Sequence, residues 1–343
     1  MTSTPPFSQY LQTETSVSTV MLRVILALIP GIAALVWFFG PGVLFNAAIA
    51  SITAVAAETL VMRLRRRSVM ACLGDLSGLV TALLLAVALP PVAPWWITVI
   101  GTGFAILMVK HLFGGIGQNP FNPAMAGYVL LLVSFPREMT TWLPPHLLAE
   151  HPLGVLDTLR AIFTGAPPGG LQWDAITMAT PLDTVRTGLG LNQTIEEIRT
   201  NPLWGDFGGR GWEWVGNGFL LGGLWMIYKR VITWHIPFAV LAGLFGTGLV
   251  FFLLDPGSHP TPLFHVFSGG AMLGAFFIAT DPVSACTTAR GKLIYGACIG
   301  VLIFIIRSWG GYPDGVAFAV LLMNMAAPTI DHYTQPRVFG HRE

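Results

Sequence analysis

The chain has 343 residues, of which 53% are hydrophobic and only 10% are charged, whereas soluble globular domains contain roughly 25% charged residues. Its formal net charge is +1 and its basic residues stand at the ends of apolar stretches, so we exclude nucleic-acid binding. We expect an all-α polytopic membrane protein, because backbone polar groups in lipid must be paired within helices.

About ten apolar stretches could cross a hydrocarbon core about 30 Å thick, which takes roughly 20 residues of helix. In chain order they are 21–39, 43–62, 69–91, 95–112, 120–135, 215–232, 236–254, 263–280, 292–307 and 315–330. The long gap after the fifth stretch divides the chain into five parts. These are an N-terminal segment 1–20, a first five-helix membrane unit 21–135, a polar loop 136–214, a second five-helix membrane unit 215–330 and a C-terminal tail 331–343.

Basic residues follow every second apolar stretch. They are Arg63, Arg65, Arg66, Arg67, Lys110, Lys229, Arg230, Arg290, Lys292, Arg337 and Arg342. The short connections on the opposite side, around 40–41, 89–94 and 255–262, contain no Lys or Arg. Because cytoplasmic connections carry the excess of positive charge, both termini are predicted to lie in the cytoplasm. The loop 136–214 then faces outward, toward the periplasm of a Gram-negative cell.

Two motifs recur in the same order in both membrane units. The segment Ser77–Ala82 is echoed by Ser268–Met272, and Phe113–Gly115 is echoed by Trp309–Gly311. Chance matching of apolar sequence is the alternative, but two motifs at a similar offset favour an internal repeat. Five membrane helices per unit is an odd number, so the second unit must enter the membrane upside down. The sequence therefore predicts about ten transmembrane helices in two inverted five-helix repeats.

The loop 136–214 contains the segment Asp174–Thr180, whose sequence is DAITMAT. It resembles the Asp-x-x-Ser/Thr-Gly-Ala-Ser/Thr signature read by flavin transferases, which join the phosphate of FMN to the last hydroxyl through a phosphoester bond. By this resemblance Thr180 is the acceptor. The other residues of the flavinylation signature are Asp174, Thr177 and Ala179.

One position departs from this signature, since Met178 stands where glycine is usual. Pro181 follows the acceptor and favours an extended, accessible Thr180. An ordinary loop threonine near a helix start is the alternative interpretation. The segment Ser268–Met272 also resembles the signature, but we reject it as an acceptor because it is apolar and ends without a hydroxyl.

Each asparagine of the segment Gln118–Met125 precedes a proline. Asn119 and Asn122 are therefore suited to cap free N–H groups, and the fifth membrane helix is predicted to begin here. A helix N-terminus at membrane depth presents positive potential, which would favour the negative charge of a reduced flavin ring. A helix cap beside a re-entrant turn, with no ligand, is the alternative.

Glu58 lies about a turn inside the second apolar stretch. Ionisable residues within a membrane commonly mark ion or proton paths, so Glu58 is a candidate for one. Alternatively, its side chain reaches Arg63 or Arg65 at the interface. The same hypothesis extends to Asp75, Lys110 and Asp281, for which a position in the cytoplasmic interface is the alternative.

The three cysteines, Cys72, Cys286 and Cys298, lie in or beside apolar stretches without Cys-x-x-Cys spacing. This pattern signals neither an iron–sulfur cluster nor a disulfide framework, and we expect small packing residues. The sequence contains no recognisable metal site, nucleotide-binding fingerprint or catalytic triad. We therefore expect no complete active site in this chain alone.

Four segments carry a resemblance that extends over essentially the full length of the chain. They are Pro30–Ala34, Gly114–Met125, Ala179–Thr184 and Gly310–Ala319. On these segments the chain resembles the D subunits of Rnf ion-translocating electron-transport complexes, which are related to the B subunits of the Na⁺-translocating NADH:quinone oxidoreductases. The short N-terminal region favours the Rnf group.

The resemblance implies an electron-transfer subunit of a ferredoxin:NAD⁺ oxidoreductase in the cell inner membrane, coupled to Na⁺ or H⁺ transport. The implied partners are the A, B, C, E and G subunits of the complex, a flavin transferase during maturation, and membrane lipid. The implied cofactors are FMN linked covalently to Thr180 and a non-covalent riboflavin near Asn119 and Asn122. The implied inverted arrangement resembles the urea-transporter fold.

Two functions of other classes remain open. A flavin-free channel or solute transporter would use the same inverted repeat, and a structural membrane scaffold would need neither a cofactor nor an ion path. Covalent flavin on Thr180 distinguishes electron transfer from both, because neither rival function has a use for it.

Overall fold

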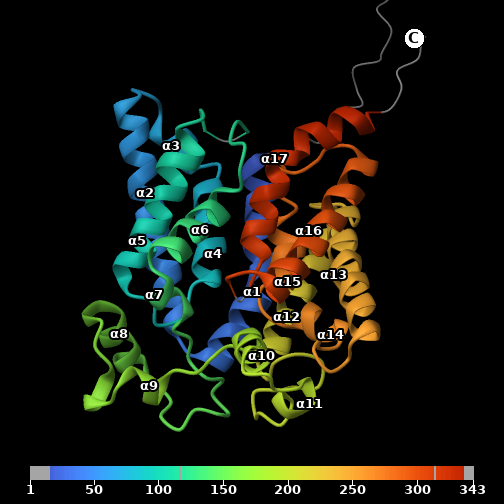
Figure 1. Cartoon of the computed structure of the whole chain (residues 1–343). Coiled ribbons are helices and arrows are strands. Elements are labelled where there is room, and N and C mark those ends of the chain that lie inside the picture. The colour runs from blue at the N-terminus through green and yellow to red at the C-terminus, as the bar shows by residue number, and fades with distance from the viewer. Residues whose placement is uncertain (1–15, 116, 313, 336–343) are drawn as a thin grey trace, which may run out of the picture.

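Nearly all of the described chain is helical. The computed structural model describes residues 16–115, 117–312 and 314–335 (Figure 1). Within these ranges no β-strand forms, and two isolated bridges join Trp142 to Met178 and Trp204 to Gly209. The all-α prediction is confirmed. The expectations for segment 1–15, Arg337 and Arg342 fall outside the described residues.

The first membrane unit begins with two long helices, and its later elements are shorter. In chain order they are α1 (Val17–Phe39), α2 (Gly42–Leu64), α3 (Val69–Leu73), α4 (Ser77–Ala88), α5 (Trp95–Phe104), the π-helix η1 (Ala105–His111) and α6 (Pro123–Ser134). The second unit also contains short elements between longer helices. Its elements are α12 (Trp212–Tyr228), α13 (His235–Leu254), α14 (Pro262–Phe267), α15 (Ala271–Leu273), the π-helix η3 (Gly274–Ile278), α16 (Ala289–Trp309) and α17 (Val316–Thr334).

Helices account for most of each predicted apolar stretch. Four helices of the described chain, α1, α2, α13 and α16, are long and apolar enough to cross a membrane by length and composition. The stretches 69–91 and 263–280 are interrupted, so the prediction of a continuous helix is wrong in both. The architecture is that of a multi-pass membrane protein with broken helices.

Each interruption contains a residue with left-handed backbone. Leu76 has a φ angle of 61° before α4, and Gly269 has a φ angle of 63° before α15. Asp75 Oδ1 accepts a hydrogen bond from the backbone N–H of Ser77 at 2.8 Å and so supports the start of α4. The break before α4 lies toward the end of the bundle that carries both described chain ends, whereas the break after α14 lies toward the other end (Figure 1).

Small residues let the membrane helices approach closely. A Cβ atom on Gly222 of α12 would collide with the carbonyl oxygen of Ala27 on α1. A Cβ atom on Gly300 of α16 would likewise collide with the carbonyl oxygen of Val240 on α13. Backbone contact of this kind is common between membrane helices, because apolar side chains gain little by leaving lipid. The α1–α12 contact joins the two units.

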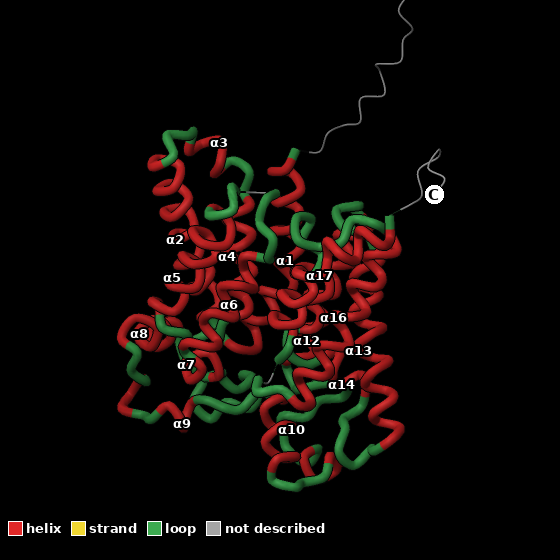
Figure 2. The backbone as a smooth tube through the Cα atoms, turned by 45° about the horizontal axis from the view of Figure 1, so that its top comes forward, coloured by secondary structure: helices red, strands yellow, loops and turns green. Residues whose placement is uncertain are grey.

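The loop between the two units folds over one end of the bundle. It contains α7 (Pro136–Thr140), α8 (Val155–Thr164), the 3₁₀-helix η2 (Pro168–Gly170), α9 (Trp173–Ile176), α10 (Pro181–Gly190) and α11 (Ile195–Ile198). Both described chain ends lie at the opposite end (Figures 1 and 2). Leu182 of α10 and Ile198 of α11 belong to one apolar cluster with Phe264 of α14. This cluster attaches the loop to the second unit beside the α14 break.

Candidate functional site

Thr180 is the N-cap residue of α10. Its φ and ψ angles of −69° and 160° are extended, as predicted for a residue that precedes proline. Thr180 Oγ1 accepts from the backbone N–H of Asp183 at 3.2 Å and donates to the Asp183 carboxylate at 2.9 Å. The predicted acceptor is therefore a half-buried hydroxyl at a helix N-terminus, with a carboxylate beside it.

The backbone of the signature is paired within the loop, to Trp142 just after α7. The N–H of Met178 donates to the carbonyl oxygen of Trp142 at 2.9 Å. Thr177 Oγ1 donates to a carbonyl oxygen of its own turn at 2.8 Å, whereas Asp174 and Ala179 are exposed. The bond to Trp142 uses only the backbone of Met178, and its side chain is exposed, so methionine fits where the signature usually has glycine.

Thr180 opens onto a cavity between the loop and the bundle, which we call the loop-side cavity. Its empty volume is about 990 Å³, including its mouth. The wall comes from both membrane units and is mostly apolar or aromatic. Its larger apolar residues are Leu35, Met125, Leu132, Trp142, Trp212 and Phe219.

Asp314 forms a polar part of this wall, and Arg307 holds it in place. Arg307 is only 6% exposed and donates from Nε and Nη2 to Asp314 Oδ1 at 3.2 and 3.0 Å. The same guanidinium donates to the carbonyl oxygens of His265 and Ser268. Asp314 Oδ2 accepts from the backbone N–H of Gly270 at 2.7 Å. One buried cation therefore fixes both the carboxylate and the α14 break.

The surroundings of Thr180 are acidic, because Asp183 and Asp314 both line the loop-side cavity. Burial raises the pKa of Asp183 above its usual range, and the charge of Asp314 raises it further. Hydrogen bonds from Thr180 and the charge of Arg186 act in the opposite direction without cancelling the effect of burial. Ionisation of Asp183 is therefore less favourable in the folded chain than in water.

A second cavity, which we call the chain-end cavity, lies toward the end of the bundle where α1 begins. Its empty volume is about 870 Å³, including its mouth. Val20 and Val24 of α1 form part of its apolar wall. Its polar and charged wall residues are Ser77, Thr81, Lys110, Asn119, Asn122, Thr280 and Asp281.

Asn119 and Asn122 both line the chain-end cavity and are only 5% and 3% exposed. Asn122 is the N-cap of α6, as predicted, and its Oδ1 accepts from the backbone N–H of Met125 at 3.1 Å. Its side-chain amide donates to the carbonyl oxygen of Ile278 at 3.3 Å. Its backbone N–H donates to Asn324 Oδ1 at 3.0 Å. The start of α6 is thus tied to η3 and α17 of the second unit.

A thin layer of protein separates the two cavities. On α6, Ala124 lines the chain-end cavity and its neighbour Met125 lines the loop-side cavity. On η3, Phe277 lines the chain-end cavity and its neighbour Ile278 lines the loop-side cavity. The two cavities therefore follow one another along the bundle and share α6 and η3 as walls.

Glu58 is 3% exposed, and among the described residues its partner is Lys110 rather than Arg63 or Arg65. Lys110 Nζ lies 2.5 Å from Glu58 Oε1 and donates to Ser77 Oγ. Arg65 instead donates to a backbone carbonyl oxygen of η1. The Lys110 side chain is buried with its carboxylate partner, being only 3% exposed.

Comparison with known proteins decides the family. The family described as NQR2, RnfD, RnfE matches residues 3–340. The chain belongs to this family. It is similar to proteins named as the D subunit of an ion-translocating oxidoreductase complex from Salmonella newport, Salmonella typhimurium and Salmonella typhi. Each is 52% identical over 344 residues, which cover 98% of this chain and 98% of the relative. The resemblance inferred from the four segments is thereby confirmed.

The sequence prediction missed both carboxylates of the loop-side cavity. Asp183 could have been found, because a carboxylate three residues after a capping threonine commonly faces the first turn. Asp314 lies in the Gly310–Ala319 segment, but its ion pair with Arg307 depends on how the chain turns between α16 and α17. No local pattern indicated that the two cavities would share a wall.

The variant Asp183→Asn should be more stable than the wild-type chain at pH 8. The amide still accepts the Thr180 hydroxyl but carries no charge, so the variant avoids ionising a partly buried group. The unfolding midpoint in detergent should rise by about 1–2 °C, and the gain should shrink as the pH falls through the raised pKa and wild-type Asp183 becomes neutral. The exposed Asp206→Asn is the control, and a lower midpoint for Asp183→Asn at pH 8 would contradict this account.

Proposed function

We propose that this chain is the D-type membrane subunit of an Rnf-type ion-translocating ferredoxin:NAD⁺ oxidoreductase and relays electrons through the membrane, coupled to Na⁺ or H⁺ transport. Family membership and the names of the relatives support this function. The observation that carries it is the Thr180 hydroxyl in the wall of one cavity, with a second cavity that shares α6 and η3 as walls.

Covalent FMN on Thr180 is the first part of the proposal, and the residues present fit it. The N-terminus of α10 offers backbone N–H groups and the positive end of a helix dipole to a phosphate attached at the cap. Tyr128, Trp142 and Trp212 offer aromatic surface for a planar ring. The bound flavin would supply the electron-accepting chemistry, while Asp183 and Asp314 would oppose further negative charge beside it.

Riboflavin in the chain-end cavity is the second part. The buried amides of Asn119 and Asn122 would orient a polar ring edge, and the apolar wall would cover the ring. Asn122 already uses its amide to hold α6, so Asn119 is the freer of the two to meet a ligand. Electrons would pass between the cavities across the layer formed by α6 and η3.

We infer that the two membrane units are inverted repeats of a ten-helix, urea-transporter-like fold. Equivalent helices make equivalent contacts, since α2 packs on α5 as α13 packs on α16, and α5 packs on α6 as α16 packs on α17. The helix breaks before α4 and after α14 lie toward opposite ends of the bundle, as inversion requires.

The proposed location is the cell inner membrane, with the chain-end side in the cytoplasm and the loop 136–214 in the periplasm. The distribution of basic residues in the sequence supports this orientation. A flavin transferase would then reach Thr180 from the periplasm. The A, B, C, E and G subunits of the complex and membrane lipid would cover the sides of the bundle.

The Glu58–Lys110 pair is a candidate for the cytoplasmic part of the ion path. Lys110 contacts Glu58 and also lines the chain-end cavity. A negative charge that arrived in that cavity would attract the Lys110 ammonium and weaken its bond to Glu58. The pair would thereby connect electron arrival to the availability of a carboxylate for a cation.

Thr180→Val should abolish covalent flavin, because valine has nearly the shape of threonine but no hydroxyl. The measurement is flavin fluorescence of the denatured chain on a gel, after co-expression with a flavin transferase. Thr177→Val is the matched control and should remain fluorescent, since the Thr177 hydroxyl is used within its own turn. A wild-type chain without fluorescence under these conditions would favour a flavin-free channel or solute transporter of the same fold.

Asn119→Leu should reduce the non-covalent flavin that acid precipitation releases from the purified chain, by about tenfold or more. Leucine has a similar volume but leaves a ligand's polar edge without a partner, which costs about 1–3 kcal/mol. Asn217→Leu, at an exposed position on α12, is the control and should release as much flavin as wild type. Equal release from both variants would remove Asn119 from the riboflavin site.

Glu58→Gln should slow ion transport by the reconstituted complex at least about tenfold, because breaking a buried ion pair commonly costs several kcal/mol. Covalent flavin on Thr180 should be unchanged, since Glu58 lines neither cavity. The exposed Glu196→Gln is the control. Wild-type transport by Glu58→Gln would exclude Glu58 from the ion path.

A further inference from the structure

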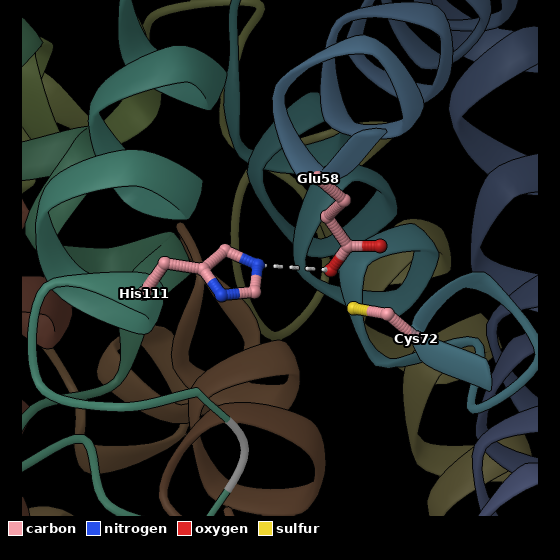
Figure 3. Close-up of side chains that lie close together, drawn as sticks. All are labelled: Glu58, Cys72 and His111. Carbon is pink, nitrogen blue, oxygen red and sulfur yellow. Dashed lines mark ion pairs between the residues drawn. The ribbon is translucent and has the colours of Figure 1, made fainter. Parts of the chain in front are cut away.

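Three side chains with metal-binding atoms converge where α2, α3 and η1 meet. Glu58 comes from α2, Cys72 from α3 and His111 from the end of η1, and their side chains point toward one another (Figure 3). One carboxylate oxygen, the thiol sulfur and one ring nitrogen all lie within 4.8 Å of one another. None of the three residues lines the loop-side or the chain-end cavity.

The ring of His111 makes no hydrogen bond to the part of the chain that the structure describes. The residue is 2% exposed, and within the described ranges neither ring nitrogen makes a hydrogen bond. Its Nε2 atom lies 3.8 Å from Glu58 Oε1, which is too long for one. Buried imidazole nitrogens are normally bonded, so this ring presents an unused donor atom to the carboxylate and the thiol.

We propose that Glu58, Cys72 and His111 form a binding site for a zinc-like divalent transition-metal ion. Imidazole, thiolate and carboxylate are the ligands that Zn²⁺ takes, whereas Na⁺ and Mg²⁺ avoid sulfur. Zinc binds such atoms at about 2.0–2.3 Å, which places tetrahedral ligand atoms roughly 3.5 Å apart. The three ligand atoms now lie within 4.8 Å of one another, so small rotations of their side chains would bring them to this spacing. Cys72 is half-buried, so an ion can reach it from the chain-end side.

The charges around the cluster balance when the metal is bound. Lys110 now holds Glu58 Oε1 and Ser77 Oγ, and Ser77 Oγ donates to Asp75 Oδ1. The metal would replace the ammonium on Glu58, while Lys110 would keep Ser77. Cys72 would lose its thiol proton to solvent as the sulfur–metal bond forms. Three negative charges, on Glu58, Asp75 and the Cys72 thiolate, then balance the two charges of the ion and the one charge of Lys110.

The site needs no flavin and its three ligand residues line neither cavity, but it shares Glu58 with the proposed ion path. Metal binding would affect both the packing of three helices and the charge pairing of Glu58. A bound ion would cross-link α2, α3 and η1 and hold Glu58 away from Lys110. It would also brace one side of the break between α3 and α4, because Cys72 lies two residues before Gly74, where that break begins.

Zinc binding by the purified full-length chain tests the site. After chelator treatment, titration with zinc chloride should give about one ion per chain, and X-ray absorption should show one sulfur neighbour beside nitrogen and oxygen. Cys72→Ser and His111→Gln should each weaken binding more than about tenfold, since loss of an outer-shell partner alone costs about 10–100-fold. Cys298→Ser, a half-buried cysteine on α16, should bind like wild type.

Lys110→Met tests the exchange of partners on Glu58. Removing the competing ammonium should tighten zinc binding by about tenfold. Zinc should also stabilise this variant against heat more than it stabilises wild type, because Glu58 otherwise has no counter-ion. Unchanged or weaker binding by folded Lys110→Met would overturn the proposed exchange.

A measurement on the wild-type chain covers the case in which a variant fails to fold. Zinc should slow the alkylation of Cys72 at least tenfold, as followed by mass spectrometry of the peptide that contains it. Three results would each overturn the site: no stoichiometric zinc, a coordination shell without sulfur, or alkylation that zinc does not affect. Equal loss of affinity in Cys72→Ser and Cys298→Ser would do the same.

Discussion

The hydrogen bonds of one buried guanidinium hold the backbone from which both cavities are built. A charge surrounded by protein at membrane depth is strongly unfavourable without partners, and Arg307 meets that requirement with two backbone carbonyl oxygens and the Asp314 carboxylate. One carbonyl oxygen belongs to His265 in the last turn of α14, and the other to Ser268 in the break that follows. From this break the chain continues into α15 and η3, and η3 lines both cavities.

In the first unit, Asn122 pairs the polar groups at a buried helix start. A helix that begins inside the bundle leaves N–H groups that water cannot reach, and Asn122 caps them while its amide binds η3 and its backbone binds Asn324 of α17. The two units are therefore joined at the thin layer between the cavities. The polar groups at the start of α6 are satisfied by the second unit, whereas those at the break after α14 are satisfied by Arg307 of the same unit.

Local chemistry explains which features could be predicted from the sequence. The extended Thr180 before Pro181 and the capping role of Asn122 before Pro123 each depend on neighbours within a few residues, and both predictions are confirmed. The helical stretches were also predictable, because apolar runs leave the backbone no other partner in lipid. The two interruptions were not, since a continuous apolar run does not reveal where Leu76 or Gly269 leaves the helix.

By itself, the sequence determined the helical class, the positions of the apolar stretches and the extended conformation of Thr180, because each follows from interactions along a few residues. Only the tertiary structure decided that Lys110 pairs with Glu58, that Asp314 meets Arg307 at the wall of the cavity and that neighbours on α6 face different cavities. A buried charge needs a partner, and the packing of the helices determines which residue that is. Which helix supplies one depends on how small residues such as Gly222 let the helices approach.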